Sequence, residues 1–185
     1  PNLVISSPLN ELDLRNLMYT GYKENNGPFV IRYPRGKGEM ADWRNEMHVL
    51  PIGKGKKLRD GDDIAILSLG PIGNEVIKAI KEIEGDGISI AHYDMIYLKP
   101  MDEELLHEVG KKFSRIITVE NGVIRGGLGS AVLEFMADNG YTPKIKRIGV
   151  PDEFVEHGPI SELYKLCGMD AKCIAEEIKK MVIGG

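Results

Sequence analysis

The chain has 185 residues, of which 42% are apolar and 28% are charged, and its formal net charge is −4. This composition predicts a soluble protein of one or two domains, each with a hydrophobic core. The negative charge gives no reason to expect nucleic acid or an anionic membrane as a partner. No apolar run approaches the roughly 20 residues of a membrane span, and the sequence does not begin like a signal peptide, so a cytoplasmic location is expected.

The first 36 residues have the pattern of a single β-α-β unit. We predict a strand over Asn2–Ser6, a helix from Pro8 to about Tyr22, and a second strand over Phe29–Tyr33. The unbroken apolar run at the start of the second strand predicts that it is buried on both faces. A unit this small leaves apolar strand faces uncovered, so we expect it to depend on a neighbour for folding.

Two arginines follow the second predicted strand, in the segment Arg32–Gly36 (Arg-Tyr-Pro-Arg-Gly). Pro34 ends the strand, which places Arg32 and Arg35 at or near its carboxyl end. Ligands bind at this edge of open α/β sheets, and a guanidinium there suits a phosphate or a carboxylate. Pairing of both arginines with carboxylates of a neighbouring domain is an equally good interpretation of the spacing.

Charged residues and glycines dominate residues 37–60, which we interpret as a linker that lies over a neighbouring surface. From Asp62 onward, strands expected at 64–69, 88–93, 115–119 and 144–148 alternate with helices at 75–83, 102–109 and 129–138. A last helix is expected from about Ala171. This alternation predicts an α/β fold, a three-layer αβα arrangement with a mostly parallel sheet. We expect residues 61–185 to fold independently of residues 1–36.

Two glycine-rich segments have the appearance of ligand-binding motifs. Gly85-Asp86-Gly87 looks like the start of a motif that holds a metal ion and a diphosphate, but it lies where a helix-to-strand turn needs glycines. The segment Gly126–Ser130 opens a helix but lacks the lysine of a phosphate-binding loop. We interpret the first as a turn and the second as a site of close backbone packing.

The histidines and cysteines give little indication of chemistry. His157 lies in a loop after the last strand, where an imidazole could face an active site, but we expect it to cap a turn or bond a backbone carbonyl. The spacing of the other histidines, His48, His92 and His107, does not suggest a metal site. Two cysteines, Cys167 and Cys173, lack a metal-binding or redox spacing and are expected to be a reduced pair.

Five motifs occur in order along the chain: Arg32–Gly36, Leu50–Gly55, Leu98–Glu103, Val119–Ser130 and Gly149–Gly158. Together they resemble the carboxyl-terminal portion of the 1-deoxy-D-xylulose-5-phosphate synthase family, which consists of transketolase-like, thiamine-diphosphate enzymes. The resemblance runs from Pro1 to about Val182. It implies that residues 1–36 end a pyrimidine-binding domain and that residues 61–185 form a transketolase C-terminal domain.

The resemblance also carries expectations about activity. The whole enzyme of this family condenses pyruvate with D-glyceraldehyde 3-phosphate, with loss of CO2, on thiamine diphosphate held by Mg²⁺, and a homodimer is expected. By motif position, Arg35 corresponds to the residue that binds the acceptor's phosphate. The family's catalytic, cofactor-binding and metal-binding residues lie upstream. The chain alone is therefore expected to bind no cofactor and to be inactive without the missing amino-terminal domains.

Two other classes remain open. The β subunit of 2-oxo-acid dehydrogenases shares the carboxyl-terminal fold and a similar Val-Glu segment with glycines, although it lacks Arg-Tyr-Pro-Arg-Gly in this order. A non-catalytic dimerisation or small-molecule-binding domain of the same fold is the second alternative, because one fold can host unrelated functions. Because the first residue is Pro1 and not methionine, we expect the chain to be a fragment of a longer protein.

Overall fold

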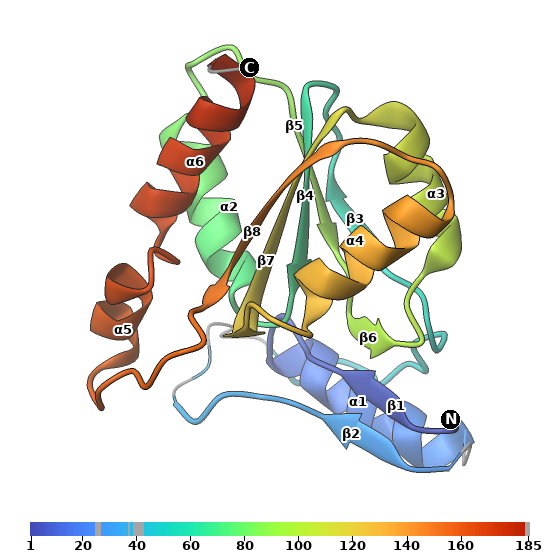
Figure 1. Cartoon of the computed structure of the whole chain (residues 1–185). Coiled ribbons are helices and arrows are strands. Elements are labelled where there is room, and N and C mark those ends of the chain that lie inside the picture. Colours follow the sequence, from blue (N-terminus) through green and yellow to red (C-terminus); the bar gives the residue numbers. More distant parts are fainter. Residues whose placement is uncertain (25–26, 37, 39–42, 184–185) are drawn as a thin grey trace.

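The computed structural model describes residues 1–24, 27–36, 38 and 43–183. A five-stranded sheet forms the centre of the larger part of the molecule, and a smaller β-α-β unit lies at one end of it (Figure 1). The large sheet has the order β3-β5-β4-β7-β8. Its strands are β3 (Lys56–Arg59), β4 (Ile64–Leu69), β5 (Ile90–Asp94), β7 (Arg115–Val123) and β8 (Lys144–Val150). Neighbouring strands are parallel except at β3, which runs antiparallel to β5, so the predicted mostly parallel sheet is confirmed.

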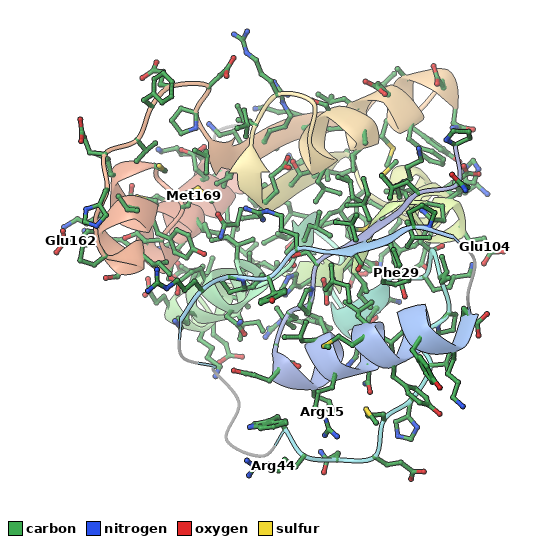
Figure 2. All side chains as sticks on the ribbon, turned by 90° about the horizontal axis from the view of Figure 1, so that it is seen from below. Arg15, Phe29, Arg44, Glu104, Glu162 and Met169 are labelled. Atoms are coloured by element: carbon green, nitrogen blue, oxygen red, sulfur yellow. The ribbon has the colours of Figure 1, made fainter. Side chains whose placement is uncertain are left out.

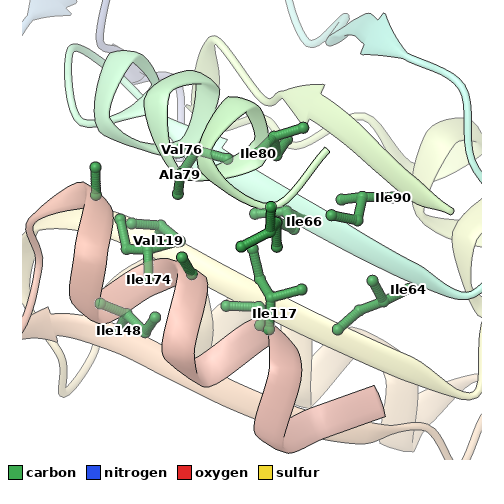
Figure 3. Packing of buried hydrophobic residues seen from close by; sticks show 14 of the residues in the cluster. Ile64, Ile66, Val76, Ala79, Ile80, Ile90, Ile117, Val119, Ile148 and Ile174 are labelled. Carbon is green, nitrogen blue, oxygen red and sulfur yellow. The ribbon is translucent and has the colours of Figure 1, made fainter. Parts of the chain in front are cut away.

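Helices cover both faces of this sheet. The helices α2 (Gly73–Glu82) and α6 (Ala171–Ile183) pack on one face, against Ile64 and Ile66 of β4 (Figure 3). On the other face, α3 (Glu103–Lys112) and α4 (Leu128–Asp138) pack against Ala65 and Leu67 of the same strand. A central strand with helices on both sides has no solvent-facing side, which explains its continuous apolar sequence. The predicted three-layer αβα arrangement is confirmed.

The smaller unit contains β1 (Val4–Ser6), α1 (Glu11–Glu24) and β2 (Phe29–Ile31). Its sheet has the order β2-β1-β6, in which β1 and β2 are parallel and β6 (Tyr97–Lys99) is antiparallel to β1. The third strand therefore comes from the later part of the chain. A small core joins the two parts, formed by Val4, Leu17, Ile96 and Tyr97.

The prediction that the second strand is buried on both faces is wrong. In the chain as described, β2 is an edge strand, and the side chain of Val30 is 43% exposed. Phe29 and Ile31 are partly buried because they pack against the small core. The strand also ends at Ile31, earlier than expected, and the residues of Arg32–Gly36 are all exposed.

A strand that sequence reasoning did not identify, β3, lies inside the segment interpreted as a linker. Three of its four residues are Lys or Arg, and it pairs with β5 at the edge of the large sheet. Charged residues are common on edge strands because they discourage pairing with other chains. The sheet thus begins before residue 61, and the domain limits at residues 36 and 60 stay predictions.

The described residues from Trp43 to Leu50, which precede β3, lie along α1, and the interpretation of residues 37–60 as a linker stays a prediction. Arg15 of α1 donates from its Nη1 to the carbonyl oxygens of Trp43 and Asn45, both at 2.9 Å (Figure 2). Further along, Asn16 and Thr20 accept hydrogen bonds from backbone N–H groups of the same stretch at 3.0 and 2.8 Å. Polar side chains of α1 therefore provide hydrogen-bond partners for backbone N–H and carbonyl groups of this stretch, which forms no strand there.

None of the described helices is long and apolar enough to cross a membrane.

The end of the chain forms two helices, of which sequence reasoning identified only the second. The first, α5 (Ile160–Leu166), is short and contains no fully buried residue, whereas α6 contributes Ile174 and Ile178 to the core.

Candidate functional site

The carboxyl ends of the parallel strands of the large sheet point toward the β-α-β unit (Figure 1). Backbone and hydroxyl groups join the two parts at this edge. The N–H of Ser7 donates to the carbonyl of Ile96 at 2.8 Å, and the hydroxyl of Ser7 donates to the carbonyl of Arg32, also at 2.8 Å. Gly70, at the end of β4, has a φ of 80°, and a Cβ at this residue would lie 2.2 Å from Ser7 Oγ. The absence of a side chain at Gly70 therefore lets the two parts approach closely.

The predicted site residue Arg35 lies just beyond β2, beside a hollow of about 250 Å³. Its chain neighbours Tyr33, Pro34 and Gly36 line this hollow, together with residues of the β1–α1 connection and of α1 that include Leu9 and Leu14. Arg35 itself is exposed, and no carboxylate among the described residues pairs with it. Its guanidinium is thus available to an anion that enters from solvent or from another part of the protein.

The other arginine of the motif, Arg32, lies at a different cavity. Arg32 lines a separate cavity of about 250 Å³ at the ends of β4 and β7, with Leu69, Glu120 and Arg125. Its backbone N–H donates to the carbonyl of Ser6 at 2.8 Å, which continues the pairing of β1 and β2 by one bond. The structure therefore does not bring Arg32 and Arg35 together in one pocket.

A buried carboxyl group that sequence reasoning missed lies between the two parts of the chain. Asp94, at the end of β5, is 1% exposed, and its Oδ1 accepts a hydrogen bond from the N–H of Ile96 at 3.2 Å. The pKa of Asp94 is raised to about 7, mainly by burial; the hydrogen bond from Ile96 lowers it, the charge of Asp13 on α1 contributes to the increase, and the charge of Lys56 opposes it. The pKa of Asp13 is raised as well, mainly by burial. In a sequence, a single aspartate at the end of an apolar strand is typical of a turn. The burial of Asp94 becomes evident only once α1 is packed over it.

The turn that follows Asp94 is strained. Ile96 has a φ of 56°, a left-handed conformation that β-branched residues rarely adopt. The side chain of Ile96 is buried in the small core, and its carbonyl accepts the N–H of Ser7. Burial and hydrogen bonding on both sides of the residue offset a cost of roughly 1–3 kcal/mol for such a conformation.

His92, to which no chemistry was assigned, forms a buried pair with Ser68. Its Nε2 lies 2.8 Å from Ser68 Oγ, and both residues are within the sheet, at most 1% exposed. Burial lowers the pKa of His92 to about 4, so the ring is neutral at pH 7. The hydrogen bond satisfies two buried polar side chains, and this explains the pair without a catalytic role.

The glycine segment Gly85–Gly87 is the turn that was predicted. It connects α2 to β5, and Asp86 within it forms an ion pair with Lys179 at 2.6 Å. Gly87 has a φ of 73°, which is favourable for glycine and explains its presence there.

The segment Gly126–Ser130 is a site of close packing, again as predicted. The two carboxylate oxygens of Glu120 accept hydrogen bonds from the N–H groups of Leu128 and Gly129, both at 2.9 Å. A Cβ at Gly127 would lie 1.9 Å from Glu120 Oε2. A carboxylate of the chain itself thus occupies the position at the start of α4 that an anionic ligand would take.

The expected turn contact of His157 is not found. His157 is exposed in the loop between β8 and α5, and no hydrogen bond joins it to another described residue. Cys167 and Cys173 are free cysteines. Within residues 1–24, 27–36, 38 and 43–183, no group of three or more His, Cys, Asp or Glu side chains could hold a metal ion.

This mostly parallel α/β sheet, closed at its carboxyl edge by a β-α-β unit, agrees with known proteins. Residues 53–174 match the family described as the C-terminal domain of transketolase, and the chain belongs to this family. It is also similar in structure to a protein described as "Split gene transketolase, inactive beta4 tetramer", with a TM-score of 0.85 and 29% identity. That match covers 99% of this chain and 58% of the other.

More specific relatives come from sequence. The chain is 80% identical over 180 residues to the 1-deoxy-D-xylulose-5-phosphate synthase of Parabacteroides distasonis, and 59% identical over 181 residues to that of Bacteroides fragilis. Each match covers 97% of this chain and 28% of the relative, so the chain spans about a quarter of the length of these curated relatives. The resemblance to the carboxyl-terminal portion of this family, predicted from five motifs, is confirmed.

Asp94 makes the stability of the fold depend on pH. In the unfolded chain its carboxyl group ionises near pH 4, whereas in the folded chain it stays protonated up to about pH 7. Stability contributed by this group is therefore lost as the pH rises from 4 to 7. We expect Asp94→Asn, which keeps the acceptor oxygen, to raise the free energy of unfolding at pH 8 by on the order of 2–4 kcal/mol and to change it little at pH 4.

Urea denaturation at pH 4, 6 and 8 measures this effect. Asp138→Asn, at an exposed position near the end of α4, is the matched control and should leave the pH dependence unchanged. An Asp94→Asn variant that is less stable than the parent chain at pH 8, or a parallel shift at all three pH values, would contradict the assigned burial of a protonated carboxyl group.

Proposed function

We propose that this chain is the carboxyl-terminal part of a 1-deoxy-D-xylulose-5-phosphate synthase, a transferase that condenses pyruvate with D-glyceraldehyde 3-phosphate and releases CO2. The observation that carries the proposal is 80% identity to a relative with that name over 97% of the chain. This level of identity favours the synthase over the β subunit of a 2-oxo-acid dehydrogenase and over a non-catalytic domain of the same fold. The product would feed isoprenoid and thiamine synthesis in the cytoplasm, and a homodimer is part of the proposal.

Arg35 is proposed to bind the phosphate of the acceptor aldehyde. Its position supports this role. Arg35 comes after β2, at the carboxyl edge of the parallel β1–β2 pair, and it is exposed beside the hollow lined by Tyr33 and Pro34. A guanidinium can donate two parallel hydrogen bonds to a phosphate, which fixes the orientation of the acceptor as well as binding it. The apolar residues that line part of the hollow, among them Leu9 and Leu14, would exclude water from one side of that contact.

Thiamine diphosphate and Mg²⁺ are proposed to bind to other domains of the enzyme. Two observations support this. Asp86, the acidic residue of the segment that looks like a diphosphate motif, is paired with Lys179, and the N-terminal end of α4 is occupied by Glu120. These two segments therefore do not offer a diphosphate site, which supports the proposal that the cofactor binds elsewhere. Thiamine diphosphate would supply stabilisation of the carbanion formed when pyruvate loses CO2.

We expect the chain of residues 1–185 alone to bind neither thiamine diphosphate nor Mg²⁺ and to have no synthase activity. Isothermal titration calorimetry with both ligands together measures this directly. One tight, Mg²⁺-dependent thiamine diphosphate site per chain would contradict the assignment of the cofactor to other domains.

In the whole enzyme, Arg35→Ala should weaken the use of D-glyceraldehyde 3-phosphate much more than the use of pyruvate. Losing a charge-assisted contact to a phosphate costs on the order of 2–4 kcal/mol. This corresponds to a roughly thirty- to thousand-fold lower kcat/KM for the aldehyde. Arg35→Lys should restore part of the loss, because lysine supplies the charge but not the paired donors.

Arg59→Ala is the matched control. Arg59 is an exposed arginine on β3, an edge strand of the large sheet, and it forms an ion pair with Glu84. Steady-state kinetics with each substrate varied in turn provide the readout. Equal losses for both substrates in Arg35→Ala, or a larger loss specific to the aldehyde in Arg32→Ala, would mean that the phosphate is assigned to the wrong arginine.

A further inference from the structure

The cavity lined by Arg32 lies where an open α/β sheet forms a natural crevice. After β4 the chain crosses through α2 on one face of the sheet to β5; after β5 it crosses through α3 on the other face to β7, which lies on the opposite side of β4. From β7 the chain continues into α4 on that second face, so the connections that leave the carboxyl ends of β4 and β7 diverge to opposite faces. Ligands of open α/β sheets bind outside the carboxyl ends of the strands at such a point.

The residues around the crevice come from both parts of the chain. Leu69 ends β4, and Glu120 lies beside it on β7 at the register Leu69↔Glu120. The β-α-β unit covers the crevice with Ser6, Ser7 and Arg32. Figure 1 shows the carboxyl ends of β4 and β7 at the end of the large sheet that faces the β-α-β unit. The cavity therefore lies between the two parts, which β6 joins.

Two arginines line this cavity, Arg32 after β2 and Arg125 in the connection after β7. Arg32 has no ion-pair or hydrogen-bond partner for its side chain among the described residues. Arg125 has one distant contact, with Nη1 4.0 Å from Asp152 Oδ2, and both side chains of that pair are more than 60% exposed. An exposed pair at this distance is worth little, so both arginines are available to an anion.

The one carboxylate in the cavity lining is already engaged by other groups of the chain. Both oxygens of Glu120 already accept N–H groups at the first turn of α4, where the helix dipole also stabilises a negative charge. The amide of Asn121 is likewise engaged, donating to the hydroxyl of Tyr164 at 3.0 Å. The side chains of Arg32 and Arg125 therefore remain to bind a ligand. Ile5, Leu69 and Leu98 form the apolar part of the cavity lining.

We propose that the cavity between Arg32 and Arg125 is a second anion-binding site, distinct from the hollow beside Arg35, and that it takes a small dianion of the phosphate or phosphate-monoester class. A dianion matches two guanidiniums in charge, and tetrahedral phosphate oxygens accept the paired donors of each. The cavity volume of about 250 Å³ is below the roughly 300–1,000 Å³ of sites for drug-sized molecules, which limits the ligand to a small one.

Occupancy of this site would stabilise the contact between the two parts of the chain. Arg32 belongs to the β-α-β unit and Arg125 to the large α/β domain, so an anion bound to both links them. A ligand that binds only the joined arrangement shifts the equilibrium toward that arrangement. The site therefore couples a phosphorylated small molecule to the position of the segment that contains Arg35, and it does so whether or not the proposed synthase activity is correct.

The test uses the whole protein that contains this chain, in an Arg35→Ala background that removes the proposed acceptor site. Titration calorimetry with inorganic phosphate at pH 8 and low salt is expected to show one site per chain, weakened by increasing salt. Arg32→Ala and Arg125→Ala should each lower the affinity at least tenfold, and each Arg→Lys variant should retain part of it. Arg115→Ala, at the opposite end of β7, is the matched control and should bind phosphate like the parent protein.

A crystal structure of the same protein with tungstate, a tetrahedral dianion, locates the site by anomalous scattering. The expected result is one peak within hydrogen-bonding distance of both guanidiniums. Unchanged phosphate affinity in Arg32→Ala and Arg125→Ala, equal loss in Arg115→Ala, or an Asp or Glu side chain of another domain in the position of the tungstate would each overturn the proposal. Thermal melts of all variants separate loss of binding from loss of folding.

Discussion

The antiparallel pairing of β1 with β6 holds the two parts of this chain together. β1 belongs to the first β-α-β unit, whereas β6 follows β5 of the large sheet, so a strand of three residues is shared between two structural units. Tyr97 in β6 is fully buried in the small core, and its hydroxyl donates to the carbonyl of Leu50 at 3.2 Å. The strained turn at Ile96 directs β6 away from the large sheet and toward β1, and the buried Asp94 accepts the N–H of that turn.

The functional proposals follow from this connection. Because β1 is fixed by β6 and by the hydrogen bond from Ser7 to Ile96, the end of β2 and the segment Arg32–Gly36 lie at the carboxyl edge of the large sheet. The segment then separates its two arginines: Arg32 lines the crevice between β4 and β7, and Arg35 lies beyond it next to α1. One structural junction therefore positions both the proposed acceptor contact and the proposed second anion site.

The main elements of the fold could be predicted from sequence because burial on two faces produces a signal that needs no knowledge of neighbours. The fully buried residues of β4 read as an uninterrupted apolar run, and the turn at Gly85–Gly87 has the glycines that such a turn requires. The elements that were missed depend on tertiary pairing. β3 is mostly lysine and arginine, and β6 is a three-residue strand that includes Lys99; neither has a pattern that marks a strand before its partner is known. The edge position of β2 also follows only from the strand order, and apolar residues alone wrongly indicated full burial.

The candidate site shows the same division. The motif identified Arg35, and its role as a phosphate ligand stays a prediction. Its separation from Arg32 could not be read from the sequence, because it depends on where the chain turns after Ile31. Asp94 and the pair of Ser68 with His92 were missed because single polar residues within or after apolar strands give no sign of their partners across the sheet.

The central claim is that the first unit folds only against the second, through β6. Thermal unfolding followed by circular dichroism, on separate chains spanning Pro1–Arg59 and Gly53–Gly185, tests it most directly; the second chain begins at Gly53 so that it keeps β3. The account predicts a cooperative transition for Gly53–Gly185 and none for Pro1–Arg59, which has lost its third strand. A cooperative transition in Pro1–Arg59 would contradict it, whether or not Gly53–Gly185 is folded.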